Sequence, residues 1–92
     1  MAVAERSARV VNPLGLHARP AAAFVKVAGT FASHVTVRRG DNEDTVNGKS
    51  IMGMMTLAAE CGSTLVIRAD GDDAERMVEA LVALVASGFG EK

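Results

Sequence analysis

The sequence predicts one α+β domain in which helices cover one face of an antiparallel sheet. Two long amphipathic helical patterns and a few short β-type runs favour a layer of helices on a layer of strands. The chain of 92 residues suffices for one core, so we treat residues 1–92 as a single domain. Hydrophobic residues make up 49% of the chain, which excludes a disordered composition.

The first half of the chain predicts a strand, a helix and a second strand. Residues 8–11 form a short β-type run, and the turn residues 12–15 end it. Over residues 18–28 the apolar side chains recur at helical spacing, and Gly29 is typical of a helix end. The alternating β-branched residues 35–37 predict the second strand.

A hairpin and a short helix are expected next. Residues 40–42 predict the hairpin turn, and residues 45–46 begin the returning strand. A further turn is expected at residues 47–48. Ser50 is a favourable N-cap, so we expect a short helix over residues 51–57.

The last strand and helix complete the order β-α-β-β-α-β-α. A loop at residues 61–63 leads into the clearest strand, residues 65–69. Asp72 or Asp73 can cap the final helix, which residues 87–88 end. Its apolar face consists of Met77, Val78, Leu81, Leu84 and Val85.

Composition argues against several classes of function. The net charge is −1, with neither a basic stripe nor a Trp or Tyr to stack on bases, so we expect no nucleic-acid partner. The apolar stretches are too short for membrane insertion, and the first residues lack the layout of a signal peptide. One Cys and two His cannot build a zinc site alone, and we expect no metal and no cofactor. Cys61 has no disulfide partner, which favours a reducing cytoplasm, and we interpret it as a semi-buried structural residue.

The most informative segment is residues 12–20, NPLGLHARP. Pro20 is typical of the first turn of a helix, where a missing N–H costs nothing, and this places His17 at the N-cap. Free backbone N–H groups and a partial positive charge at a helix N-terminus favour an anion and disfavour an imidazolium. We therefore expect a neutral, nucleophilic imidazole at His17.

This placement suits a transferable phosphoryl group. A phosphoryl group on Nδ1 of His17 would meet the N–H groups of Ala18 and Arg19, and the Arg19 side chain would add a charge-assisted contact. Gly15 would let the loop adopt a conformation that other residues resist. The chain has no Gly-rich nucleotide-binding loop, so the pattern favours a carrier over an enzyme. A lone histidine would more often only cap its helix, but these neighbours favour the functional interpretation.

Residues 15–20, Gly-Leu-His-Ala-Arg-Pro, resemble the active-site motif of HPr, the histidine-containing phosphocarrier family of the bacterial phosphotransferase system. The resemblance covers nearly the whole chain in length and element order. It implies an open-faced β-sandwich of four antiparallel strands with three helices on one face. It also implies that enzyme I phosphorylates His17 to a pros-phosphohistidine, that Arg19 stabilises the phosphate, and that the phosphoryl group passes to A components of enzyme II.

The segment KSIMGMMTL, residues 49–57, carries a second set of candidates. The residues alone predict only an N-cap at Ser50, and a stripe of apolar side chains like this one more often belongs to the core. The resemblance implies that Ser50 is the regulatory serine phosphorylated by an ATP-dependent HPr kinase/phosphorylase. It also implies that the stripe, which consists of Ile51, Met52 and Met55, is part of the docking surface for partners.

Two departures from the family pattern leave questions open. The hairpin at residues 38–45 is longer and more polar than is usual, and we interpret this as a loop insertion. Leu14 stands where other members often have a polar residue, so Asn12 is the candidate substitute for contact with the phosphate. An alternative function is a regulatory HPr-like module of the nitrogen branch that acts mainly through protein–protein binding. Without an oligomerisation signal, we expect a monomer.

Overall fold

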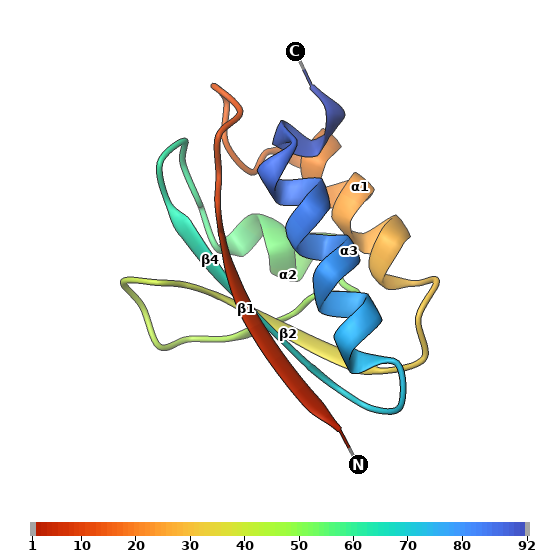
Figure 1. Ribbon diagram of the computed structural model, residues 1–92. Helices are drawn as coiled ribbons and strands as arrows, with labels where there is room; N and C mark the ends of the chain where they lie inside the picture. The colour runs from red at the N-terminus through yellow and green to blue at the C-terminus, as the bar shows by residue number, and fades with distance from the viewer. Residues whose placement is uncertain (1, 92) are drawn as a thin grey trace.

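An antiparallel sheet covered by helices confirms the predicted fold class. The computed structural model describes residues 2–91. In chain order the elements are β1 (Val3–Arg9), α1 (Ala18–Ala28), β2 (His34–Arg39), β3 (Val46–Asn47), α2 (Ile51–Thr56), β4 (Thr64–Asp70), α3 (Ala74–Ala86) and the 3₁₀ turn η1 (Gly88–Gly90). The helices lie together on one side of the sheet (Figure 1).

The sheet has the strand order β1-β4-β2-β3, and every neighbouring pair is antiparallel. β4 is central because it pairs with β1 from Val3↔Asp70 to Arg9↔Thr64 and with β2 along its other edge. Its alternate residues Leu65, Ile67 and Ala69 are fully buried, as the two-residue period of a half-buried strand requires.

The core lies between the sheet and the helices. α3 packs on β1 and β4, while α1 contacts both α2 and α3. Burial of each large apolar side chain contributes about 1.5–3 kcal/mol to this packing. The largest fully buried side chains are Phe24, Met54, Leu65, Ile67, Met77 and Leu81.

Two strand boundaries differ from the prediction. β1 spans Val3–Arg9 and not residues 8–11, because its inward residues Ala4 and Ala8 are too small to produce a strong hydrophobic signal. Its pairing with β4, which is invisible in the sequence, sets its length. β3 includes Asn47, which we expected in a turn, because this residue pairs with Thr36.

Asp73 occupies the predicted N-cap of α3 but its side chain does not cap the helix. Its carboxylate accepts hydrogen bonds from Ala32 N at 2.8 Å, from Ser33 N at 2.9 Å and from the Ser33 hydroxyl. These donors, led by the Ser33 hydroxyl, lower the pKa of Asp73 to about 2. Asp73 thus joins the start of α3 to the segment that precedes β2.

The end of α3 and the start of α1 lie at the same end of the molecule, opposite the N-terminus (Figure 1). After α3 the chain turns through Gly88–Gly90, and the buried Phe89 adopts a left-handed conformation with φ of 59°. This turn directs Glu91 toward the N-terminus of α1, where His17 lies.

Candidate functional site

His17 stands at the N-cap of α1, as the sequence predicts. Its backbone is extended, with φ of −90° and ψ of −169°, and its side chain is 36% exposed. The loop before it is held by hydrogen bonds from Gly15 N to Asn12 O (3.0 Å) and from Leu16 N to Ala59 O (2.8 Å). The imidazole therefore projects from a fixed backbone at the surface.

Gly15 is required by the close approach of this loop to the segment after α2. Its φ is +69°, which L side chains rarely adopt. A Cβ at this position would lie 2.6 Å from the carbonyl oxygen of Ala59 and 2.9 Å from Cα of Glu60. The predicted need for glycine is confirmed, and its cause is both conformational and steric.

The N-terminus of α1 is open to an anion. Within residues 2–91 no side chain caps this helix, and its first turn contains no acidic residue. The N–H groups of Ala18 and Arg19 have no intrahelical acceptor because they belong to the first turn, and Pro20 has no N–H at all. Two backbone donors and the positive end of the helix dipole thus lie beside the imidazole.

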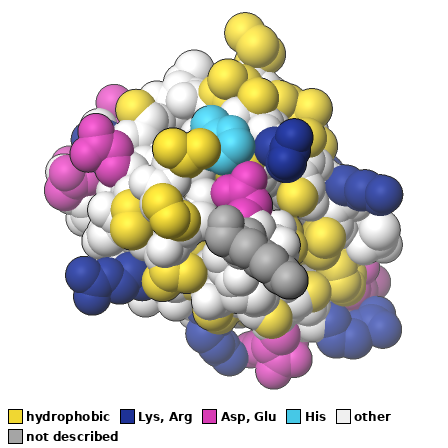
Figure 2. Space-filling model, turned by 90° about the horizontal axis from the view of Figure 1, so that it is seen from above, with side chains coloured by type: hydrophobic (Ala, Val, Ile, Leu, Met, Phe, Trp, Pro, Cys, Tyr) yellow, Lys and Arg dark blue, Asp and Glu magenta, His cyan; other side chains and the backbone are white. Residues whose placement is uncertain are grey.

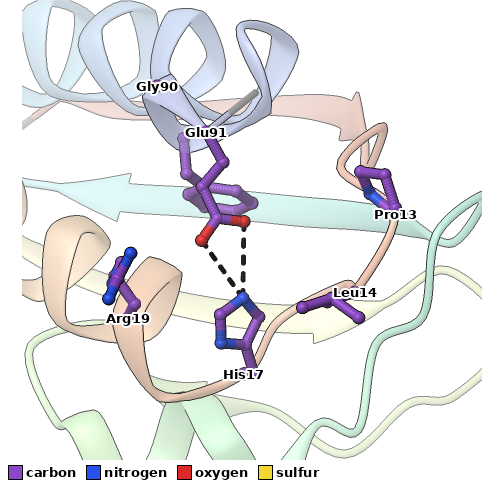
Figure 3. Close-up of a pocket in the computed structure, with 7 residues that line it drawn as sticks. Pro13, Leu14, His17, Arg19, Gly90 and Glu91 are labelled. Atoms are coloured by element: carbon purple, nitrogen blue, oxygen red, sulfur yellow. Dashed lines mark hydrogen bonds and ion pairs between the residues drawn. The ribbon is translucent and has the colours of Figure 1, made fainter.

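Arg19 is exposed and faces the same pocket as His17 (Figure 3). None of the ion pairs found within residues 2–91 involves Arg19, so its guanidinium stays available to a ligand. The pocket is lined by Pro13, Leu14, His17, Arg19, Phe89, Gly90 and Glu91. Seen from this end, a histidine lies among hydrophobic side chains, beside one acidic and one basic side chain (Figure 2).

Glu91 is a site residue that sequence reasoning missed. Its two carboxylate oxygens lie 3.3 Å (Oε1) and 3.1 Å (Oε2) from Nε2 of His17, although 74 positions separate the residues. Figure 3 shows the other ring nitrogen pointing away from Glu91. Only the turn after α3 brings the two side chains together, and no local motif in the sequence marks that contact.

Asn12 joins the loop to Glu91. This buried side chain donates from Nδ2 to Gly15 O at 2.7 Å and to Glu91 Oε1 at 2.9 Å. Its amide N–H groups are therefore used within the protein, in a different role from the phosphate contact that we considered from the sequence.

The structure separates the apolar residues of α2 into two groups. Met54 is fully buried, whereas Ile51, Met52 and Met55 are exposed, Met52 by 75%. The alternative that these three residues belong to the core is therefore wrong, and they form an apolar surface, as a docking surface requires. Ser50 is the N-cap as predicted, because its Oγ accepts a hydrogen bond from Gly53 N at 3.0 Å.

The remaining candidates lie outside this arrangement. Cys61 is exposed and not semi-buried as expected, with Sγ 3.6 Å from Val11 O. His34 is exposed on β2, where it pairs with Asp70.

The described residues contain no group of three or more His, Cys, Asp or Glu placed to hold a metal ion. None of the helices in this part of the chain is long and apolar enough to cross a membrane.

Comparisons with known proteins show the family of the chain. Residues 4–87 match the family model described as the PTS HPr component phosphorylation site. The phosphocarrier protein HPr of Cupriavidus necator is 45% identical over 87 residues, which cover 95% of this chain and 96% of the relative. A crystal structure of HPr from Thermoanaerobacter tengcongensis is 44% identical with a TM-score of 0.88, covering 97% of this chain and 98% of that one. A structure described as an HPr dimer from the same organism is 51% identical with a TM-score of 0.73, covering 84% and 86% of the two chains. The chain therefore belongs to the HPr family of phosphocarrier proteins of the phosphotransferase system.

Proposed function

We propose that the chain accepts a phosphoryl group from phospho-enzyme I on Nδ1 of His17 and passes it to A components of enzyme II. One observation carries the proposal: His17 lies at the uncapped N-terminus of α1, with Nε2 against Glu91 and its other ring nitrogen turned away from that carboxylate. This arrangement supports the proposal because it leaves one ring nitrogen free of the carboxylate on a residue that begins an anion-binding helix N-terminus.

From this chain the transfer requires only the side chain of His17 and the donor groups that bind the charged phosphate oxygens. The Nδ1 lone pair attacks phosphorus while the bond to the donor breaks and its electron pair leaves with the donor. The N–H groups of Ala18 and Arg19 then bind the phosphate oxygens, and the Arg19 guanidinium adds a charge-assisted contact. Delivery reverses these steps on an acceptor protein, so His17 carries the group between partners.

Phosphorylation by enzyme I and phosphoenolpyruvate tests this proposal. We expect one acid-labile phosphoryl group on the wild-type protein by intact mass, and none on His17→Ala. The control is His34→Ala, because His34 is an exposed histidine on a strand and away from the pocket. If the wild type stays unmodified beside a competent enzyme I, or if His17→Ala is labelled, the proposal fails and a regulatory HPr-like module becomes the better interpretation.

Ser50 is proposed as a regulatory phosphorylation site for an HPr kinase/phosphorylase. A phosphate there would add a charge of about −1.5 to −2 at a helix N-terminus, where the helix itself tolerates negative charge. It would also stand next to the exposed Ile51 and Met52, so we expect weaker docking of enzyme I with little change in fold. Kinase and ATP should label the wild type but not Ser50→Ala, and the labelled protein should accept phosphate from enzyme I more slowly at unchanged melting temperature.

Docking of partners is proposed to use Ile51, Met52 and Met55. We expect Met52→Ala to raise the KM of phospho-enzyme I for this protein without lowering the melting temperature, since the side chain is 75% exposed. Val3→Ala is a matched control because Val3 is also an exposed apolar residue, on β1. Equal KM values for the two variants would contradict this assignment.

The oligomeric state of this protein and its cellular compartment stay predictions. We propose a cytoplasmic monomer, while a relative from Thermoanaerobacter tengcongensis is described as a dimer. Light scattering after size exclusion at several protein concentrations measures the assembly directly, and a mass of two chains would contradict the monomer.

A further inference from the structure

We propose that Glu91 is a positioning residue for the transfer: its carboxylate holds the ring proton of His17 on Nε2 and balances the charge of the phosphorylated ring. This inference rests on the proposed function, which it deepens by assigning a residue at the C-terminal end of the described chain to the same site. It makes two predictions that differ from those of a purely structural contact, one on the position of the ring proton and one on the transfer rate.

The contact between Glu91 and His17 is specific in geometry. Both carboxylate oxygens face the same ring nitrogen, at 3.1 and 3.3 Å, and the carboxylate side chain is only 19% exposed. Partial burial limits screening by water and makes a charge-assisted hydrogen bond stronger than one at an open surface. In Figure 3 the Glu91 carboxylate faces one nitrogen of the His17 ring, and the second ring nitrogen lies on the side away from the carboxylate.

The chemistry of the pair determines where the proton lies. An ionised carboxylate only accepts hydrogen bonds, so the nitrogen that faces it must be a donor. A neutral imidazole has one N–H, and its other nitrogen then carries a free lone pair. Glu91 therefore favours the tautomer in which Nε2 bears the proton and Nδ1 is the nucleophile.

The same carboxylate serves the phosphorylated state. When Nδ1 forms its bond to phosphorus, Nε2 keeps its hydrogen and the ring becomes a cation, which Glu91 neutralises. On delivery a nucleophile of the acceptor protein forms a bond to phosphorus as the N–P bond breaks, the electron pair of that bond returns to Nδ1, and the ring leaves as neutral imidazole with the proton still on Nε2. No other proton donor or co-reactant is needed in either step.

A left-handed turn after α3, with strain at Phe89, delivers Glu91 to the ring. Gly88, Phe89 and Gly90 all have positive φ, at 73°, 59° and 74°. A left-handed conformation is unfavourable for a non-glycine residue, and burial of the Phe89 side chain offsets this cost. Such strain persists where the surrounding packing enforces it, and here its result is the contact with His17.

Asn12 sets the orientation of Glu91 and yields a sharp prediction for Glu91→Gln. Because Asn12 Nδ2 donates to the Oε1 position, the amide oxygen of a glutamine would take that place. Its NH₂ group would then occupy the Oε2 position, 3.1 Å from Nε2 in the native contact, where it favours an unprotonated Nε2. The amide oxygen at the Oε1 position, 3.3 Å from Nε2, can still accept the Nε2 proton, so the fraction of rings with Nε2–H should fall and the Nδ1 lone pair should be available less often.

The test combines ring ¹⁵N NMR with single-turnover transfer from phospho-enzyme I. We expect mainly Nε2–H in the wild type, a smaller fraction of Nε2–H in Glu91→Gln, and a transfer rate at least about tenfold lower in that variant. Glu91→Asp keeps a carboxylate and should retain the Nε2–H form. Glu79→Gln is the control for net charge, because Glu79 is an exposed residue of α3 outside the pocket.

The outcomes separate this inference from the function on which it rests. A wild type that accepts no phosphate from enzyme I refutes the proposed function, while the tautomer measurement still tests the Glu91 contact. If the wild type accepts phosphate, a fraction of Nε2–H in Glu91→Gln that equals that of the wild type overturns the role of Glu91. A Glu91→Gln rate within about twofold of both the wild type and Glu79→Gln overturns it as well.

Discussion

Substitution of Gly15 by alanine tests how the fold holds the loop that carries His17. The added Cβ would lie 2.6 Å from Ala59 O, so that carbonyl must move, and the hydrogen bond that it accepts from Leu16 N at 2.8 Å must weaken. A left-handed alanine costs about 1–2 kcal/mol and a weakened backbone hydrogen bond about 1 kcal/mol more. Because the backbone of Ala59 and Glu60 must also shift, we expect a total loss of about 3 kcal/mol in the free energy of unfolding.

Gly62→Ala is the matched control for this prediction. Gly62 also has a positive φ, +96°, but the nearest atom to its added Cβ is the tip of the Arg9 side chain at 4.0 Å. It therefore carries the conformational cost alone, about 1–2 kcal/mol. Urea unfolding followed by far-UV circular dichroism measures both variants, since the chain has no Trp or Tyr for fluorescence. Equal losses in the two variants would refute the steric argument at Gly15.

Three further predictions concern the core, a cap and an ion. Met54→Ala should lose about 2–5 kcal/mol of stability because Met54 is fully buried, whereas Met52→Ala should lose less than about 0.5 kcal/mol; urea unfolding compares them. Ser50→Ala should lose about 1 kcal/mol in the same assay, because the N-cap hydrogen bond at 3.0 Å disappears; an unchanged stability would contradict that role. For Asp73, the pKa lowered from 3.8 to about 2 means that its hydrogen bonds stabilise the fold above about pH 4 and lose this effect as the pH falls toward 2. Asp73→Asn should therefore melt below the wild type at neutral pH, and thermal melts at decreasing pH should show the difference narrowing between pH 4 and 2; a constant difference would contradict it.

Local features of the sequence predict most of the fold. The α1 bounds at residues 18 and 28 match the prediction, because an amphipathic pattern and a first-turn proline are both local signals. The Ser50 N-cap is likewise local, since its hydrogen bond spans three residues. Strand β1 was placed wrongly because small alanines face the core and its pairing partner lies about sixty residues away in the chain, so no local window contains the cause.

The surface of α2 shows the limit of local patterns in another way. Its short apolar stripe gives no direct measure of burial, so the residues alone left open whether Ile51, Met52 and Met55 belong to the core or to a docking surface. In the structure α2 packs against α1 and β3, Met54 is fully buried, and the other three residues are exposed. The choice depends on how the helix rotates against its neighbours, which is a tertiary property.

For the candidate site, the sequence by itself determined that the proposed nucleophile, His17, stands at a helix N-terminus. His17 at the N-cap, Arg19 and Pro20 lie within one helical turn, where backbone geometry alone relates them. Only the tertiary structure decided that Glu91 and Asn12 complete the site. Glu91 contacts His17 across a separation of 74 residues and Asn12 across one of 79 residues. Geometry within one helical turn follows from the order of the residues. The contact between Glu91, which follows α3, and His17, which precedes α1, depends instead on how α3 packs across the sheet.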